Sequence, residues 1–153
     1  MKASRKKTAV IGVGNVLYGD DGFGVRVACE LKTAKLPRGV EVIDGGSVGV
    51  GLIEYLKDYE QVIIIDAADM GLPPGTLKVF RPEEVKSLKS DRTFSLHSAD
   101  VLGVIELGMA LGEKLAEVTI IAVQPEFVGA REGLSAVVEA AVAKGVAEAI
   151  RLF

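Results

Sequence analysis

The sequence predicts an α/β fold: a three-layer sandwich with a mainly parallel, twisted, five-stranded sheet, one antiparallel edge strand and helices on both faces. Short apolar runs alternate with segments whose apolar residues recur at helical spacing, which is typical of βαβ units. The run Val62–Ile65 also contains four consecutive β-branched residues, as expected of a central strand that is buried on both faces. At 153 residues, we expect one domain over residues 1–153.

The first half of the chain contains three predicted strands and two predicted helices. Phe23, Val27 and Leu31 are spaced four residues apart, which predicts that they share the buried face of the first helix. Gly45-Gly46 marks the end of the second strand. The expected elements are strands at 8–12, 40–44 and 61–66 and helices at 21–36 and 51–57.

The second half begins with a predicted turn at Pro73-Pro74-Gly75 and ends with a helix that Ser135 is expected to cap. The edge strand follows the turn directly, and its weak alternation favours an antiparallel position. The expected elements are a strand at 76–80, a short helix at 82–88, a loop at 91–98, a helix at 99–111, a strand at 118–123 and a final helix from 135 to about 152.

Composition excludes several classes of function. A net charge of −3 gives no basic surface for nucleic acid, and no apolar run approaches the roughly 20 residues of a membrane span. Cys29 is the only cysteine, so neither an intramolecular disulfide nor a thiolate zinc cluster can form. We expect a soluble protein of the cytoplasm without a signal peptide.

Polar residues follow the predicted parallel strands, where open α/β sheets bind their ligands. Asp20-Asp21 follow the first strand, Asp44 ends the second, Asp66 ends the third, and the only histidine is His97. A carboxylate directly after an apolar strand is costly to bury unless a cation or donors meet it. Asp21, Asp66 and His97 together form a plausible ligand set for a first-row metal with open positions.

Each of these residues also has a purely structural alternative. One of Asp20 and Asp21 is explained as a helix N-cap, and a lone histidine is as often structural as it is a ligand. A dinucleotide site fits poorly, because Leu17 replaces the third glycine and Asp44 lies about 30 residues after the glycines rather than about 20. A phospho-receiver module needs a lysine after the last strand, where the first basic residue is Arg131.

The segment 12–24 resembles the opening motif of the hydrogenase maturation endopeptidases, G-x-G-N-x-L-x-x-D-[DE]-x-x-G. Further segments are similar to later elements of that family and occur in the same order. These are Asp44-Gly45-Gly46-Ser47, Ile65-Asp66-Ala67, His97–Leu102 and Gln124-Pro125-Glu126.

The resemblance implies one peptidase domain that removes the C-terminal extension from a nickel-loaded [NiFe] hydrogenase large-subunit precursor. Asp21, Asp66 and His97 would then be the catalytic and metal-contacting residues, with the nickel supplied by the precursor. We expect Asn15, Asp20 and Asp44 to contact the substrate. Two alternatives stay open: a small metal-dependent hydrolase with another substrate, and a non-catalytic receiver-like or nucleotide-binding module.

Overall fold

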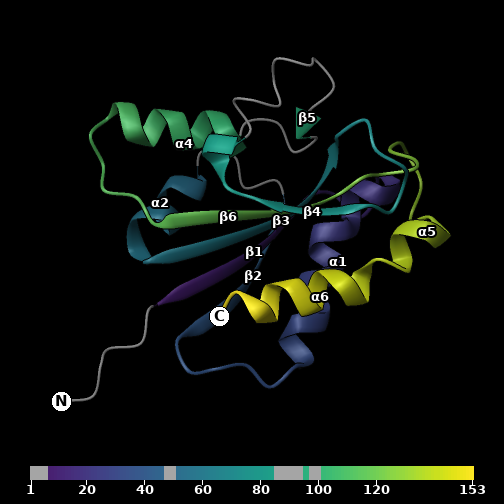
Figure 1. The fold of residues 1–153 in the computed structure, drawn as a ribbon, viewed down its shortest axis with the longest axis horizontal. Coiled ribbons are helices and arrows are strands. Elements are labelled where there is room, and N and C mark those ends of the chain that lie inside the picture. Colours follow the sequence, from purple (N-terminus) through teal and green to yellow (C-terminus); the bar gives the residue numbers. More distant parts are fainter. Residues whose placement is uncertain (1–6, 47–50, 85–94, 97–100) are drawn as a thin grey trace.

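A mixed β-sheet forms the middle layer of the computed structural model, which describes residues 7–46, 51–84, 95–96 and 101–153 (Figure 1). The strand order is β2-β1-β3-β6-β4, with β4 antiparallel to β6 and the other neighbours parallel. The predicted mainly parallel sheet with one antiparallel edge is therefore confirmed. The strands are β1 (Thr8–Val13), β2 (Val40–Gly46), β3 (Gln61–Asp69), β4 (Leu77–Phe80) and β6 (Glu117–Val123).

Helices cover both faces of this sheet, which gives the three predicted layers (Figure 1). Alternate residues of β3 point into two separate cores. Val62 and Ile64 pack on the side of α2 and α4, whereas Ile63 and Ile65 pack on the side of α1 and α6. The helices are α1 (Phe23–Thr33), α2 (Leu52–Asp58), α4 (Val101–Ala110), α5 (Ala136–Glu139) and α6 (Val142–Arg151). No helix within the described ranges is long and apolar enough to cross a membrane.

Two glycines bring α1 unusually close to the sheet. A Cβ atom at Gly24 would lie 2.0 Å from the carbonyl oxygen of Ile65 and 2.5 Å from that of Val13. A Cβ atom at Gly12 would lie 2.2 Å from the carbonyl oxygen of Gly24. Only glycine fits at these positions, so the start of α1 is held against the ends of β1 and β3.

The first helix and the third strand differ from the prediction. The helix begins as a 3₁₀ turn, η1 (Gly19–Gly22), and α1 ends at Thr33 rather than near Leu36. Strand β3 runs to Asp69 instead of ending at Asp66, because β5 (Ser95–Leu96) pairs with its last residues. Residues 95–96 were expected in a loop, and a two-residue strand leaves no periodic signal in a sequence.

The final helix is divided rather than continuous. Helix α5 ends at Glu139, and the amide of Ala141 donates to the carbonyl oxygen of Val138 at 3.0 Å, a tighter 3₁₀-type bond, before α6 begins. Ser135 precedes α5 as predicted, but it makes no capping hydrogen bond. Its hydroxyl donates to Asp20 instead.

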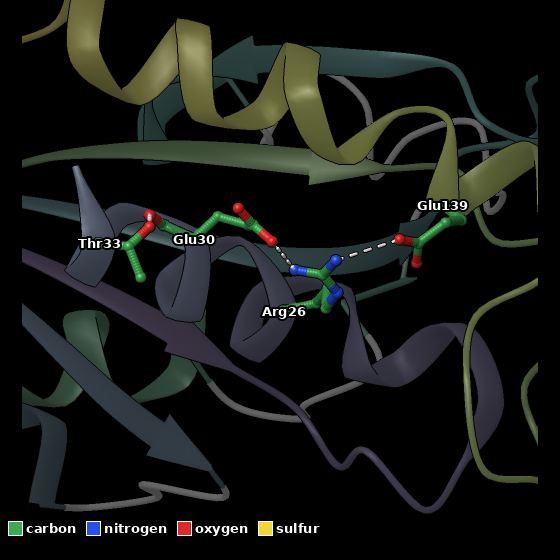
Figure 2. A network of polar contacts seen from close by, with 4 residues as sticks. All are labelled: Arg26, Glu30, Thr33 and Glu139. Atoms are coloured by element: carbon green, nitrogen blue, oxygen red, sulfur yellow. Dashed lines mark hydrogen bonds and ion pairs between the residues drawn. The ribbon is translucent and has the colours of Figure 1, made fainter.

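An exposed polar network joins α1 to α5 (Figure 2). Arg26 donates to Glu30 on its own helix and lies 3.2 Å from a carboxylate oxygen of Glu139. Thr33 donates its hydroxyl to the carbonyl oxygen of Glu30 at 2.8 Å. Exposed pairs of this kind each contribute about 0–1 kcal/mol, so the apolar cores provide most of the stability.

Candidate functional site

Asp66 lies within β3 and is fully buried. Its neighbour across the sheet is Ala122 of β6, and its Oδ1 accepts the amide hydrogen of Ala67 at 2.8 Å. The residues before it form the apolar centre of the sheet, so this carboxylate is placed where water is excluded. Such a group needs donors or a cation to compensate for its lost hydration.

Asp21 lies in η1 and is 6% exposed. Its Oδ2 accepts the amide hydrogen of Asn15 at 2.8 Å. The close contact of Gly24 with Ile65 holds this segment beside β3, one residue before Asp66. The structure therefore brings the segments carrying the two predicted carboxylates side by side.

Gly14 makes room for Asp21. Its φ angle is +130°, and a Cβ atom there would lie 1.9 Å from the carbonyl oxygen of Asp21. The amide of Gly14 donates to the carbonyl oxygen of Gly46 at 2.9 Å, which joins the ends of β1 and β2. Gly14, directly after β1, thus shapes the backbone around Asp21.

Asn15 and Asp44, two of the predicted substrate contacts, shape neighbouring turns. Oδ1 of the half-buried Asn15 accepts the amide hydrogen of Leu17 at 2.9 Å. Oδ1 of the exposed Asp44 accepts the amide hydrogen of Gly46 at 3.2 Å. Asp44 lies opposite Gly12 in the β1–β2 register, so it lies at the same end of the sheet as Asp21.

Asp20, the third predicted substrate contact, has a different environment. Its side chain is fully buried and accepts hydrogen bonds from both the amide and hydroxyl of Ser135 and from the amides of Glu126 and Phe127. Burial by itself raises the pKa of Asp20, but the bonds from Phe127, Ser135 and Glu126 outweigh it and lower the pKa below its usual value. The hydrogen-bond partners of Asp20 in the structure are therefore groups of the chain itself, and its substrate contact stays a prediction.

His97 lies outside the described residues, so its position relative to Asp21 and Asp66 stays a prediction. The nearest described residue before it, Leu96, pairs with Ala68 at the end of β3, two residues beyond Asp66. Across the described ranges, no three His, Cys, Asp or Glu residues form a group that could hold a metal ion.

Gln124 is a buried polar residue to which sequence reasoning assigned no role. Its Oε1 accepts the amide hydrogens of Met70 at 2.6 Å and Leu72 at 3.3 Å, and its Nε2 donates to Asp69 at 3.3 Å. It therefore fastens the chain after β3 to the end of β6. The sequence contained a signal, since a glutamine directly after an apolar strand is a polar residue at a position where burial is expected.

Exposed large apolar side chains occur on the turn before Asp21 and on the loop after β6. Val16, Leu17 and Tyr18 are 47%, 59% and 47% exposed, and Phe127 is 44% exposed. Phe127 contacts the backbone at Gly19, and the Arg131 guanidinium lies 5.8 Å from its ring centroid. We call Leu17, Tyr18 and Phe127 the apolar rim. The hydrogen bonds between residues 17–20 and the loop at 127–131 place these three residues on adjoining segments, and exposed apolar surface of this kind is available for binding another macromolecule.

Comparisons with known proteins agree on one family. The family model HycI, hydrogenase maturation protease, matches residues 25–152. The hydrogenase expression/formation protein HupM of Azotobacter chroococcum mcd 1 is 36% identical, over 96% of this chain and 73% of HupM. HoxM of Azotobacter vinelandii is 38% identical, over 76% of this chain but 57% of HoxM, so the chain spans little more than half of that relative. The structure of the hydrogenase maturating endopeptidase HybD from E. coli matches with a TM-score of 0.83 at 31% identity, covering 95% of this chain and 91% of HybD.

Proposed function

Because the chain belongs to the hydrogenase maturation protease family, we propose that it removes the C-terminal extension of a [NiFe] hydrogenase large-subunit precursor once nickel has been inserted. The observation that carries this proposal is the pair of buried carboxylate residues, Asp21 and Asp66, on adjacent segments at the carboxyl end of the sheet. A lone cysteine fits a reducing compartment, which supports the cytoplasm as the place of this step.

In this proposal Asp21, Asp66 and His97 contact the nickel that the precursor already holds. The metal is then part of the substrate and not a resident cofactor of this chain. Carboxylate oxygens and an imidazole complement thiolate ligands contributed by the precursor. A precursor without nickel lacks this anchor, so binding discriminates between finished and unfinished metal centres.

Cleavage needs an activated water molecule and a polarised scissile carbonyl group. Two groups can activate the water: the precursor's nickel as a Lewis acid, or the carboxylate of Asp21 or Asp66 as a general base. Asp21 and Asp66 lie in a region of low exposure, where electrostatic interactions are stronger than in water. The apolar rim supports a protein substrate, because these side chains would be buried when the precursor docks.

The direct test is to incubate the chain with nickel-loaded and nickel-free precursor and to follow the precursor's mass. We expect a mass loss at its C-terminus only for the nickel-loaded form. Equal cleavage of both forms would contradict the proposed discrimination between nickel-loaded and nickel-free precursor. Cleavage of neither form would contradict the proposed activity. His97→Ala should abolish the mass loss, whereas Asp58→Asn, an exposed carboxylate at the end of α2, should leave it unchanged.

A further inference from the structure

We propose that Asp20 is a positioning residue: its buried carboxylate fastens the loop 126–135 to the turn that carries Asp21, and so holds Asp21 in place. The effect on catalysis rests on the function proposed above. We call the contacts of Asp20 with the loop 126–135 the clamp. The existence of the clamp rests only on contacts within this chain.

Both oxygens of the Asp20 carboxylate are engaged. Oδ2 accepts from the amides of Glu126 at 2.9 Å and Phe127 at 3.0 Å and from the hydroxyl of Ser135 at 2.8 Å. Oδ1 accepts from the amide of Ser135 at 2.7 Å. A carboxylate offers about four lone-pair sites, and four donors approach this one, three at Oδ2 and one at Oδ1. The donors come from the two ends of the loop 126–135, which the single side chain therefore closes.

Backbone hydrogen bonds extend the same junction. The amide of Asp20 donates to the carbonyl oxygen of Phe127 at 2.9 Å, and the amide of Gly19 donates to that of Arg131 at 2.6 Å. The amide of Arg131 in turn donates to the carbonyl oxygen of Leu17 at 3.1 Å. Gly19 has a φ angle of +60°, and a Cβ atom there would lie 2.7 Å from the carbonyl oxygen of Phe127. The turn and the loop are thus joined along their length.

The position of this clamp links it to the proposed reaction. Asp20 immediately precedes Asp21, so any shift of the Asp20 backbone moves the backbone of Asp21 as well. Burying an ionised group is costly, and well-packed apolar residues usually stabilise a fold as much or more. A buried carboxylate with four directional hydrogen bonds instead favours one arrangement of the turn and the loop. Misplacement of a reacting group by about 1 Å can lower a rate on the order of 100-fold.

The test compares Asp20→Asn with two further variants. The amide nitrogen of asparagine must face a backbone N–H donor in either orientation, because backbone amides approach both carboxylate oxygens. Ser135→Ala removes only the hydroxyl donor and keeps the three backbone bonds. Val62→Ala shortens a fully buried side chain in the first half of β3, away from Asp66, and serves as a control for lost stability.

Two measurements are made on the full chain at a temperature where circular dichroism shows every variant folded. The first is amide hydrogen exchange. We expect Asp20→Asn to accelerate exchange in residues 15–22 and 126–135 by about 10-fold or more through local opening, while exchange of the β3 and β6 amides is unchanged. Acceleration spread evenly over the sheet, or none at all, would overturn the clamp.

The second measurement is the single-turnover rate on nickel-loaded precursor. We expect the rate to fall roughly 10- to 100-fold in Asp20→Asn and less in Ser135→Ala, and to stay within about twofold of wild type in Val62→Ala. An equal loss in Val62→Ala and Asp20→Asn would reduce Asp20 to a stabilising residue. If the wild-type chain does not process precursor, the proposed function is wrong, and the exchange measurement alone decides whether the clamp exists.

Discussion

Among single residues, Asp66 gives the sharpest test of the proposed site. Asp66→Asn keeps the size of the side chain and its carbonyl acceptor for the Ala67 amide but removes the negative charge. We expect precursor processing to fall at least about 1,000-fold, since the residue would lose both metal contact and electrostatic stabilisation. Mass spectrometry of the precursor measures the rate, and a urea titration checks that the variant is folded.

The control for Asp66→Asn must lose a charge without touching the site. Asp58→Asn fulfils this condition, because Asp58 is exposed at the end of α2. Normal processing by Asp66→Asn would show that the charge is dispensable and that the site assignment is wrong. Loss of processing in Asp58→Asn as well would indicate a general charge effect on precursor binding.

Asp20 also makes stability depend on pH. The pKa of its carboxyl is lowered in the folded chain by the hydrogen bonds of Phe127, Ser135 and Glu126, which outweigh the opposing effect of burial. A lowered folded-state pKa stabilises the fold above the unfolded value of 3.8, and this stability is lost as the pH falls through the folded value. We expect the free energy of unfolding to decrease as the pH falls below about 4. The slope of this free energy against pH should correspond to at most about one proton fewer in Asp20→Asn than in wild type.

Urea titrations of wild type and Asp20→Asn between pH 2.5 and about 6 measure this slope. The wild-type advantage over the variant should be greatest above pH 4 and should shrink as the solution is acidified. Parallel curves for the two proteins would show that Asp20 keeps an ordinary affinity for protons, in conflict with its four hydrogen bonds.

At the scale of elements, the contact between α1 and the sheet depends on glycine. Gly24→Ala places a methyl group where the carbonyl oxygens of Ile65 and Val13 lie, so α1 must move outward. We expect a loss of about 1–3 kcal/mol in unfolding free energy, and slower processing, because α1 follows directly on the turn with Asp21. Thermal and urea denaturation measure the loss.

The matched control is Gly103→Ala in α4. Gly103 is exposed and helical, so alanine there should stabilise the helix by up to about 1 kcal/mol. A gain at Gly103 and a loss at Gly24 would separate helix propensity from close packing. If Gly24→Ala were as stable as wild type, the claim that α1 lies too close to β1 and β3 for a side chain at position 24 would be wrong.

The elements that the sequence predicted best are those with dense local signals. Short apolar runs located β1, β3 and β6, and the spacing of Phe23, Val27 and Leu31 identified the buried face of α1, where all three are fully buried. β5 could not be predicted, since its two residues are stabilised by pairing with the distant end of β3. The break between α5 and α6 also left no periodic signal.

The candidate site shows the same division between local and distant effects. Asp66 could be selected as a candidate from the sequence, because burying a carboxylate after an apolar strand is costly in any context. The hydrogen-bond donors of Asp20 could not be selected in this way, because they lie 106, 107 and 115 residues further along the chain. Hydrogen-bond partners that are this remote are set by tertiary structure. For this reason the hydrogen bonds of the buried Asp20 could not be foreseen from the sequence, and its substrate contact stays a prediction.

At the scale of the whole molecule, the apolar rim predicts how the precursor docks. The clamp of Asp20 joins the segments that carry Leu17, Tyr18 and Phe127, so these side chains are held in place before binding. A preorganised surface loses less conformational entropy on association. Replacing Leu17 and Phe127 together by serine should therefore weaken precursor binding, and should lower the melting temperature far less than loss of a fully buried core side chain would, because both side chains are partly exposed.

We expect this double variant to raise KM for nickel-loaded precursor roughly 10-fold, equivalent to about 1.4 kcal/mol, with little change in the maximal rate. The control replaces Met109 and Leu111, which are 67% and 65% exposed, by serine. Met109 lies in the last turn of α4, and Leu111 follows that helix on the chain leading into β6. Strand β6 begins at Glu117, opposite Gln61 at the start of β3, so this end of the sheet is remote from Asp66 (Figure 1). A rise in KM for the control pair and none for the rim pair would show that the precursor binds near α4 and not at the apolar rim. A fall in maximal rate without a change in KM would instead assign Leu17 and Phe127 to the chemical step, because an interaction made only in the transition state lowers kcat.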